Sequence, residues 1–280
     1  MQSLPLVASF AIGLVMAPAT IRTLREQGLE QENYRGARLA FPAGIAIVAA
    51  AVVALVPLGL AQQLTDGDVW PGPIGAVAVY VVGVALLGVL DDLVGSAAAA
   101  PRGWRGHAAA VAGGRFSTGA LKALGALGLA LFVFSGTGLG TGEYLLAVAL
   151  LVLTTNLFNL LDLRPGRSIK ALVLLGAGLT IGALDVAPLW VLGLFVGPIL
   201  AVLPHDLRER GMLGDTGSNV VGAVAGLWLV LTLDTTGQAI ALALVALATV
   251  YGEFRSISAL IERTPGLRQL DSLGRIPASP

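Results

Sequence analysis

The sequence predicts an all-α membrane protein, a polytopic bundle of about nine transmembrane helices forming a single domain over residues 1–280. The 280-residue chain is 56% hydrophobic and only 12% charged, whereas a soluble domain carries about 25% charged residues. Its apolar runs are too long for strands and lack period-two alternation. The absence of cysteine excludes disulfides, and two histidines are too few for a multi-histidine zinc site. The zero net charge gives no argument for a nucleic-acid partner.

Nine apolar runs are long enough to cross a bilayer core, which needs roughly 20 helical residues and tolerates about 17. Many of them contain Gly and Ala, which let helices approach closely in lipid. An odd number of spans places the two termini on opposite faces, with a basic tail at about 255–280. In order, the predicted spans are 3–21, 40–61, 74–91, 119–136, 144–161, 168–184, 187–204, 217–233 and 238–254.

All 17 Lys and Arg residues can be placed on one side of the membrane, because they occur in alternate loops only. The positive-inside rule then puts the N-terminus outside and the C-terminus in the cytoplasm, in a multi-pass protein of the cell inner (cytoplasmic) membrane. The opposite loops contain acids but no bases, at Asp66, Asp68, Glu143, Asp185 and Asp234. The basic clusters are Arg22–Arg38, Arg102–Lys122, Arg164–Lys170, Arg208–Arg210 and Arg255–Arg275.

Two adjacent acids, Asp91 and Asp92, end the third predicted span. A carboxylate beside hydrocarbon costs about 3 kcal/mol even on the lenient insertion scale. The pair therefore needs a divalent cation, a Lys or Arg partner, or water. The alternative is a solvated helix end, although acids at a helix C-terminus oppose the macrodipole.

A polar strip ends the fifth predicted span, where Asn156, Asn159 and Asp162 recur at a spacing of three. This spacing places them along one helix face over about 9 Å, which predicts a polar cavity. The alternative is that the amides serve only hydrogen bonding between helices. The basic residues that follow, Arg164 and Arg167, are candidates for binding phosphates, or they fix topology alone.

The eighth predicted span opens with Gly214-Asp215-Thr216-Gly217-Ser218. Glycines allow close backbone approach, and the first N–H groups of a helix can face an anion or a carboxylate. Asp215 is either a helix cap or part of a site. Together with Asp91, Asp92 and Asp162, it would supply carboxylate oxygens at one membrane depth. Mg²⁺ takes such oxygens together with substrate phosphates and neutralises charge in phosphoryl transfer.

The chain resembles the polyprenyl-phosphate N-acetylhexosamine-1-phosphate transferases, the glycosyltransferase family 4 that includes phospho-N-acetylmuramoyl-pentapeptide transferase. The resemblance covers about residues 20–260 and is carried by three ordered motifs at matching helix ends. Asn33-Tyr34-Arg35-Gly36, followed by Phe41-Pro42-Ala43-Gly44, is also similar to the first inner loop of the family. The motifs are Leu90-Asp91-Asp92, Asn156-x-x-Asn159-x-x-Asp162 and Gly214-Asp215-Thr216-Gly217-Ser218.

The resemblance implies transfer of a sugar-1-phosphate from a nucleotide sugar, UDP-linked in the family, to a membrane polyprenyl phosphate. UMP leaves, Mg²⁺ is required, Mn²⁺ could replace it, and the family can form homodimers. Asp91 and Asp92 match the aspartates that are expected to act on the lipid phosphate. Asp215 and Asp92 match the residues of the metal site. By the same resemblance, Asp162 joins the catalytic set, and the substrate-binding residues are Lys122, Asn156, Asn159, Arg164 and Arg167.

Four features depart from the family pattern. Pro165 replaces the second Asp of the family's Asp-Gly-Leu-Asp-Gly run, which leaves the nucleotide base unassigned. The His-rich inner loop is absent, and residues 261–268 take its place. The family has ten spans where this sequence predicts nine. His107 and His205 match no family histidine, and we expect them to be solvated.

Two other functions remain open from the sequence. A secondary transporter would place acids on broken helices at the membrane midplane and contain an inverted repeat; here the acids lie at one face and no repeat is evident. A non-catalytic relative of the transferases would keep the motifs and bind lipid phosphate, but it would turn over no nucleotide sugar. An enzyme using CDP-alcohols is disfavoured, because its paired Asp-x-x-Asp helix pattern is missing.

Overall fold

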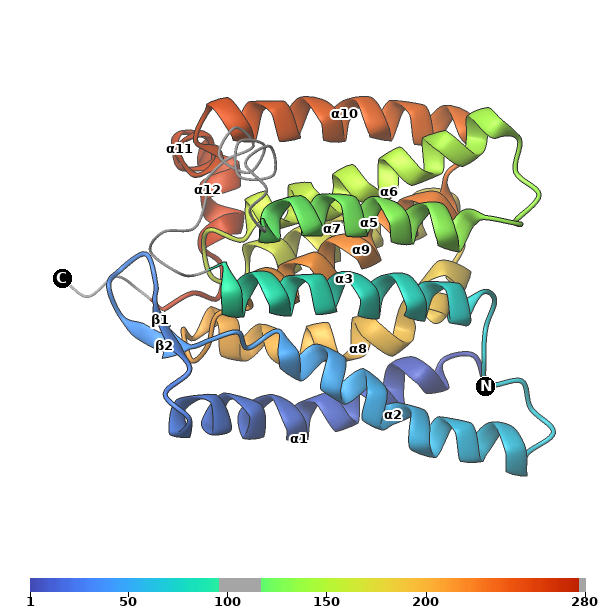
Figure 1. Cartoon of the computed structure of the whole chain (residues 1–280), viewed down its shortest axis with the longest axis horizontal. Helices are drawn as coiled ribbons and strands as arrows, with labels where there is room; N and C mark the ends of the chain where they lie inside the picture. Colours follow the sequence, from blue (N-terminus) through green and yellow to red (C-terminus); the bar gives the residue numbers. More distant parts are fainter. Residues whose placement is uncertain (96–116, 277–280) are drawn as a thin grey trace.

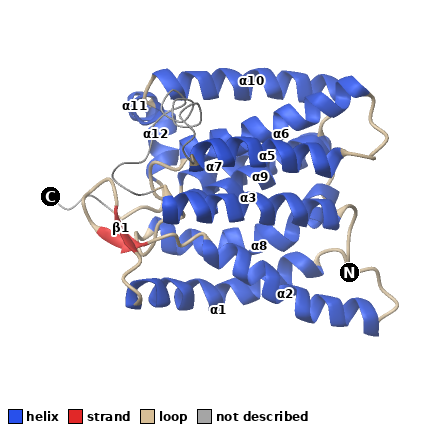
Figure 2. Ribbon diagram, viewed as in Figure 1, coloured by secondary structure: helices blue, strands red, loops and turns tan. Residues whose placement is uncertain are grey.

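The computed structural model describes residues 1–95 and 117–276, and these form a bundle of helices that run back and forth along one axis (Figures 1 and 2). This confirms the prediction of an all-α bundle. Each of the nine predicted spans coincides with one long helix. The long helices are α1 (Leu4–Glu26), α2 (Ile45–Leu64), α3 (Ile74–Val94), α5 (Thr118–Phe134), α6 (Thr141–Leu161), α7 (Arg167–Ala183), α8 (Ala187–Leu207), α9 (Gly214–Thr232) and α10 (Thr235–Phe254).

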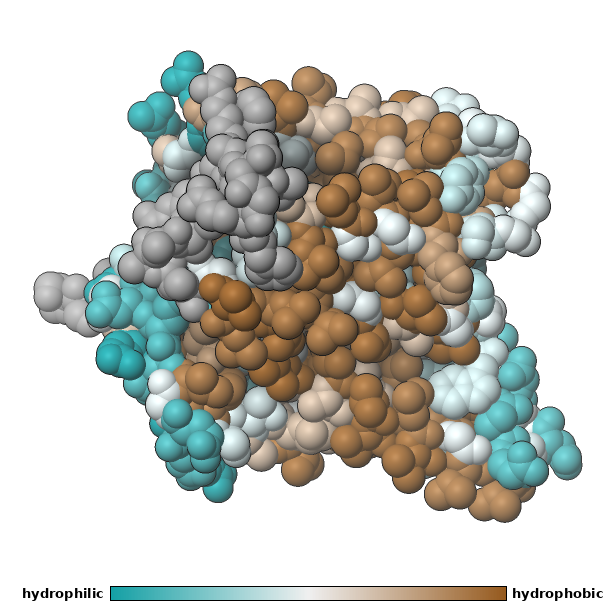
Figure 3. All heavy atoms as spheres, viewed as in Figure 1, coloured by the Kyte–Doolittle hydropathy of each residue, from teal (hydrophilic) through white to brown (hydrophobic). Residues whose placement is uncertain are grey.

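Six helices in the described part of the chain are long and apolar enough to cross a membrane: α1, α2, α3, α6, α8 and α10. The chain is therefore a membrane protein by the length and composition of its helices. Figure 3 shows apolar residues across the middle of the visible face and hydrophilic residues at both ends of the bundle. Helices α5 and α7 have 17 residues each. The count of nine spans and the orientation stay predictions.

Helix α9 does not meet the composition expected of a lipid-facing span because it is the core of the bundle. It is buried without interruption from Thr216 to Leu229, and it packs against α3, α6, α7 and α8. A helix surrounded by protein can begin with the polar residues of the Gly214–Ser218 motif, since they meet other side chains instead of hydrocarbon. The burial of α9 thus brings this motif into the interior.

The loop between α1 and α2 contains the two-stranded antiparallel sheet of the described chain, β1 (Glu30–Glu32) and β2 (Arg38–Ala40). The sequence did not predict strands here, because a local turn forms them and no apolar alternation marks them. The Asn33 side chain accepts hydrogen bonds from the backbone N–H groups of Arg35 and Ala37. The backbone N–H of Met212 donates to the carbonyl oxygen of Ala40 at 2.9 Å, and this bond ties the hairpin to the loop before α9.

Residues 255–276, expected as a tail, form two short helices, α11 (Ile257–Arg263) and α12 (Pro265–Ser272). Both lie across the end of the bundle that also holds the hairpin, roughly perpendicular to the long helices (Figure 1). The N-terminus lies at the opposite end. All basic residues of the described chain therefore belong to loops and helix ends on the α11–α12 side.

Candidate functional site

A cavity of about 500 Å³ opens at this basic end, between the hairpin and the ends of α3, α6 and α9. It brings together acids that are far apart in the sequence. Five of the predicted site residues line it directly: Asp91, Asp92, Asn159, Asp162 and Asp215. The three helices that carry the family-like motifs thus meet around one space.

Asp92 holds the start of α9. One carboxylate oxygen accepts the backbone N–H of Asp215 at 2.8 Å, and the other accepts the N–H of Thr216 at 2.9 Å and its hydroxyl at 2.6 Å. The side chain is buried, and these bonds to the positive end of the helix offset its lost hydration. This geometry gives Asp92 a positioning role, and its role as a metal ligand stays a prediction.

Lys122 of α5 connects the other two acids. Its ammonium forms an ion pair with Asp215 and lies 3.7 Å from an oxygen of Asp91. A lysine between two carboxylates neutralises part of their charge, which allows the pair to exist at the end of apolar helices.

The polar strip of α6 is divided between different environments. The Asn159 amide donates to the side-chain oxygen of Asn219 at 3.2 Å, and Ser168 donates to Asp162 at 2.9 Å. Loss of water around the Asp162 carboxyl raises its pKa well above the usual range, and the charge of Asp206 adds to this, although Ser168 counteracts it. Asn156 points away from the large cavity into a second one.

This second cavity has a volume of about 250 Å³ and lies between α3, α5, α6 and α9. Its walls are mainly apolar, with Lys122 and Asn156 among the polar groups that line it. Because Lys122 pairs with Asp215, the ion pair stands between an apolar cavity and the acidic one.

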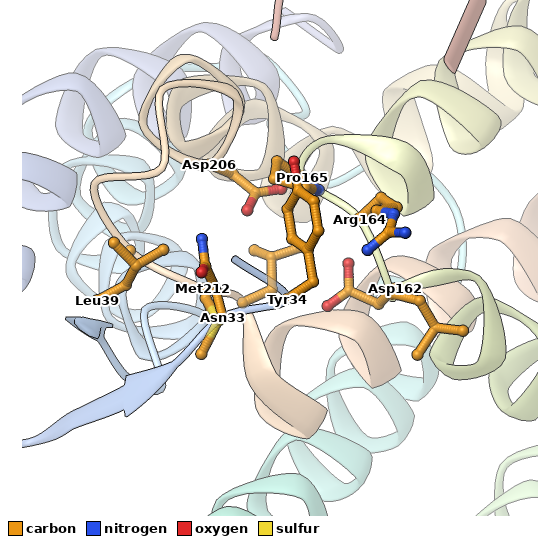
Figure 4. A pocket seen from close by; sticks show the side chains of 11 residues that line it. Asn33, Tyr34, Leu39, Asp162, Arg164, Pro165, Asp206 and Met212 are labelled. Atoms are coloured by element: carbon orange, nitrogen blue, oxygen red, sulfur yellow. The ribbon is translucent and has the colours of Figure 1, made fainter. Parts of the chain in front are cut away.

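The two predicted arginines do not line the large cavity. Arg164 stacks its guanidinium 4.1 Å from the centroid of the Tyr34 ring and lines a separate cavity of about 70 Å³ (Figure 4). Arg167 is buried and bonds to Ser258 and Asp271 of the C-terminal helices. His107 lies outside the described residues, and His205 lines none of these three cavities.

Three residues were missed from the sequence. Asp206 is buried at the end of α8, where its carboxylate accepts the Gly166 N–H at 2.7 Å; Figure 4 shows Asp206 and Asp162 around the ring of Tyr34. Its signal was available, since an acid at the end of an apolar run, next to basic residues, is the same pattern that singled out Asp91. Ser218 and Thr216 were seen only as part of a glycine-rich helix start.

The carboxylates at this cavity fit a magnesium site in which substrate phosphates supply the remaining ligands. Within residues 1–95 and 117–276, no three His, Cys, Asp or Glu side chains converge as a complete metal site. Mg²⁺ is usually held by one or two carboxylates plus substrate phosphates and waters, and Asp215 would be such a ligand. The oxygens of Asp92, the second predicted ligand, already accept bonds from the start of α9, which leaves Asp91 as the other carboxylate beside Asp215. Ser218, which lines the same cavity, has a buried hydroxyl without a partner among the described groups.

Neither a protein-family model nor a curated protein matches the sequence. The geometry on its own shows a membrane helical bundle with an acid-lined cavity at its basic end.

Proposed function

We propose that the protein is a glycosyl-1-phosphate transferase of the membrane. It would transfer a sugar-1-phosphate from a nucleotide sugar, with UDP as the expected nucleotide, to a polyprenyl phosphate. The observation that carries the proposal is the meeting of Asp91, Lys122 and Asp215, from three helices, beside a cavity of about 500 Å³. In the reaction, an oxygen of the lipid phosphate attacks the sugar-linked phosphorus. The bond from that phosphorus to the UMP oxygen breaks, which yields a polyprenyl-diphosphate sugar and UMP.

The contacts support a division of roles. Asp91 would remove a proton from the lipid phosphate or orient it, and Lys122 would contact a phosphate once it leaves its ion pair with Asp215. Asp92 would keep the start of α9 in place through its bonds to the Asp215 and Thr216 backbone. Bound Mg²⁺, which Mn²⁺ could replace, would neutralise charge on the phosphates. Asn159 and Asp162 line the cavity where the nucleotide diphosphate would lie.

The two cavities support a substrate with one polar and one apolar end. A lipid phosphate could place its phosphate at Lys122 and part of its chain among the apolar side chains of the 250 Å³ cavity. This arrangement would keep the reacting groups at the basic end of the bundle. With nine spans and the basic loops inside, that end would face the cytoplasm at the inner membrane.

The decisive experiment supplies the purified protein in lipid with polyprenyl phosphate, Mg²⁺ and a panel of nucleotide sugars, and measures release of nucleoside monophosphate. We expect release with at least one member and its loss when Mg²⁺ is chelated. Asp215→Asn should reduce the rate by at least about 10²-fold, as removal of a charge-stabilising group does in other enzymes. Asp66→Asn is the matched control at the opposite end and should leave the rate unchanged.

Full activity of Asp215→Asn would contradict the metal role. No release with any nucleotide sugar, combined with binding of lipid phosphate, would favour the non-catalytic alternative. Substrate flux through liposomes that contain the pure protein would favour a transporter.

A further inference from the structure

The turn at residues 162–166, between α6 and α7, shapes the candidate site. Asp162 and Leu163 line the 500 Å³ cavity, and Asp162, Arg164 and Pro165 line the 70 Å³ cavity. Gly166 ends the turn with a positive φ of 70°, a conformation that side chains other than glycine rarely adopt. Its N–H is held by Asp206. A short turn of this kind needs further contacts to keep one geometry, and the C-terminal helices provide them.

The first of these contacts is a buried ion pair between α7 and α12. Arg167, at the start of α7, is only 4% exposed. Its Nε and one Nη donate to the two oxygens of Asp271 at 2.8 and 3.0 Å, and its other Nη donates to Ser258 of α11 at 2.8 Å. A bidentate guanidinium–carboxylate pair is strong and geometrically specific. Both C-terminal helices are thereby fixed to the residue that follows the turn.

Arg275 completes the network from the other side. Its two Nη atoms donate to Asp271 at 2.8 and 2.6 Å, and its Nε donates to the carbonyl oxygen of Pro165 at 2.8 Å. The contact to Pro165 lies within the turn itself, at the position where the sequence departs from the family pattern. Burial alone would raise the pKa of Asp271, but the hydrogen bonds from Arg167 and Arg275 outweigh it and hold the pKa at about 2. The carboxylate is therefore charged at neutral pH.

Lys170, one helical turn beyond Arg167, adds a third connection. Its ammonium donates to the backbone carbonyls of Leu270, Asp271 and Leu273. Cations are favoured at this end of a helix, because the last carbonyls have no partners within the helix. The connections therefore join the segment 165–170 to the segment 258–275 through both side chains and backbone.

We propose that α11 and α12 brace the 162–166 turn against the bundle, which makes Asp271 and Arg275 positioning residues of the candidate site. The brace would hold Asp162 and Leu163 in the wall of the large cavity. Its effect on substrate rests on the proposed transferase function, whereas its effect on the turn does not. A plain anchor for the end of the chain would stabilise α12 without changing the turn.

The test uses hydrogen exchange and kinetics on the full-length protein in lipid. Arg275→Met removes the contact to Pro165 and leaves the Arg167–Asp271 pair in place, and Asp271→Asn removes the charge at the centre. We expect amide exchange of residues 162–170 to accelerate about tenfold or more in both variants, because each loses hydrogen bonds to a charged group. Exchange in α1 and α2 should stay at the wild-type rate. Asp271→Glu should restore slow exchange, and Arg268→Met, an exposed arginine on the same helix, is the matched control.

The kinetic readout separates positioning from stability. We expect the KM for the nucleotide sugar to rise about tenfold in Arg275→Met. The change in kcat should be smaller, because the variant weakens substrate binding more than it slows the chemical step. Unchanged exchange in residues 162–170, or faster exchange throughout the bundle, would overturn the brace. Accelerated exchange with unchanged KM would overturn the positioning role. If the wild-type protein turns over no nucleotide sugar, the proposed function fails, and the exchange data still decide whether the brace holds the turn.

Discussion

The buried hydroxyls of this bundle fall into two classes with opposite expected contributions to stability. Thr216 donates its hydroxyl hydrogen to the buried Asp92 carboxylate at 2.6 Å. The hydroxyl of Thr154, which is equally buried on α6, has no partner among the described residues. A hydrogen bond to a charged group contributes about 1.5–3 kcal/mol, whereas an unpaired buried hydroxyl contributes nothing to offset its desolvation. Whether a buried threonine hydroxyl has a hydrogen-bond partner therefore decides how much it contributes to stability.

Replacement of these two threonines by valine tests that difference. Thr216→Val should destabilise the protein by about 1.5–3 kcal/mol, because Asp92 loses a donor while the side-chain volume is nearly conserved. Thr154→Val should be neutral or slightly stabilising. Thermal unfolding in detergent, followed by circular dichroism, measures both. Equal unfolding temperatures for the two variants would show that the Thr216 bond contributes little to the start of α9.

At the scale of elements, the site depends on how closely α3 and α9 approach. Gly88 of α3 faces the backbone of α9, and a Cβ atom added there would lie 2.6 Å from the carbonyl oxygen of Asp215. Gly44 similarly faces the backbone around Gly217. The absence of a side chain at Gly88, one helical turn before Asp92, lets α3 come close enough for Asp92 to reach the first N–H groups of α9. The glycine content of the spans therefore serves the geometry of the site as well as packing in lipid.

Gly88→Ala should push α3 away from α9. We expect a loss of about 1–3 kcal/mol of stability, the usual cost of overpacking, together with a loss of the proposed transferase activity. Gly128→Ala on α5 is the matched control, because nothing lies within 4 Å of the added Cβ and alanine favours the helix. Unfolding temperature and nucleoside monophosphate release check the pair. A Gly88→Ala variant as stable and active as Gly128→Ala would show that the close approach is unnecessary.

At the scale of the whole molecule, charge separates the two ends of the bundle. The end with the hairpin and α11–α12 (Figure 1) carries the described basic residues and the candidate site. The loop between α2 and α3, at the end with the N-terminus, contains Asp66 and Asp68 and no base. Six described helices are long and apolar enough to cross a membrane. If the positive-inside rule governs insertion, the basic end faces the cytoplasm.

The chain contains no cysteine, which makes its orientation directly testable. We expect a membrane-impermeant thiol reagent added outside intact cells to label Asp66→Cys and to leave Arg263→Cys unlabelled until the membrane is opened. Labelling of both variants from outside, or of Arg263→Cys alone, would contradict the predicted orientation. The unsubstituted protein serves as the control for background labelling.

Nearly all of the helical architecture could be predicted from the sequence. Apolar runs and charged loops are properties of consecutive residues, and they located each long helix to within a few residues. The same local patterns singled out Asp91, Asp92, Asp162 and Asp215, which the fold brings to one cavity. The small hairpin and the short C-terminal helices escaped prediction, because a turn and contacts with distant residues stabilise them.

The partner of each polar group could not be predicted in this way, because it is supplied by a residue far along the chain. Asp92 is hydrogen-bonded to Thr216, which lies 124 positions away in the sequence, and Arg167 is hydrogen-bonded to Asp271, which lies 104 positions away. Arg164 and Arg167 carry the same charge three residues apart, yet one stacks on Tyr34 and the other is buried beneath α12. Hydropathy and charge place a residue at a membrane depth, whereas its neighbours at that depth follow from which helices pack together.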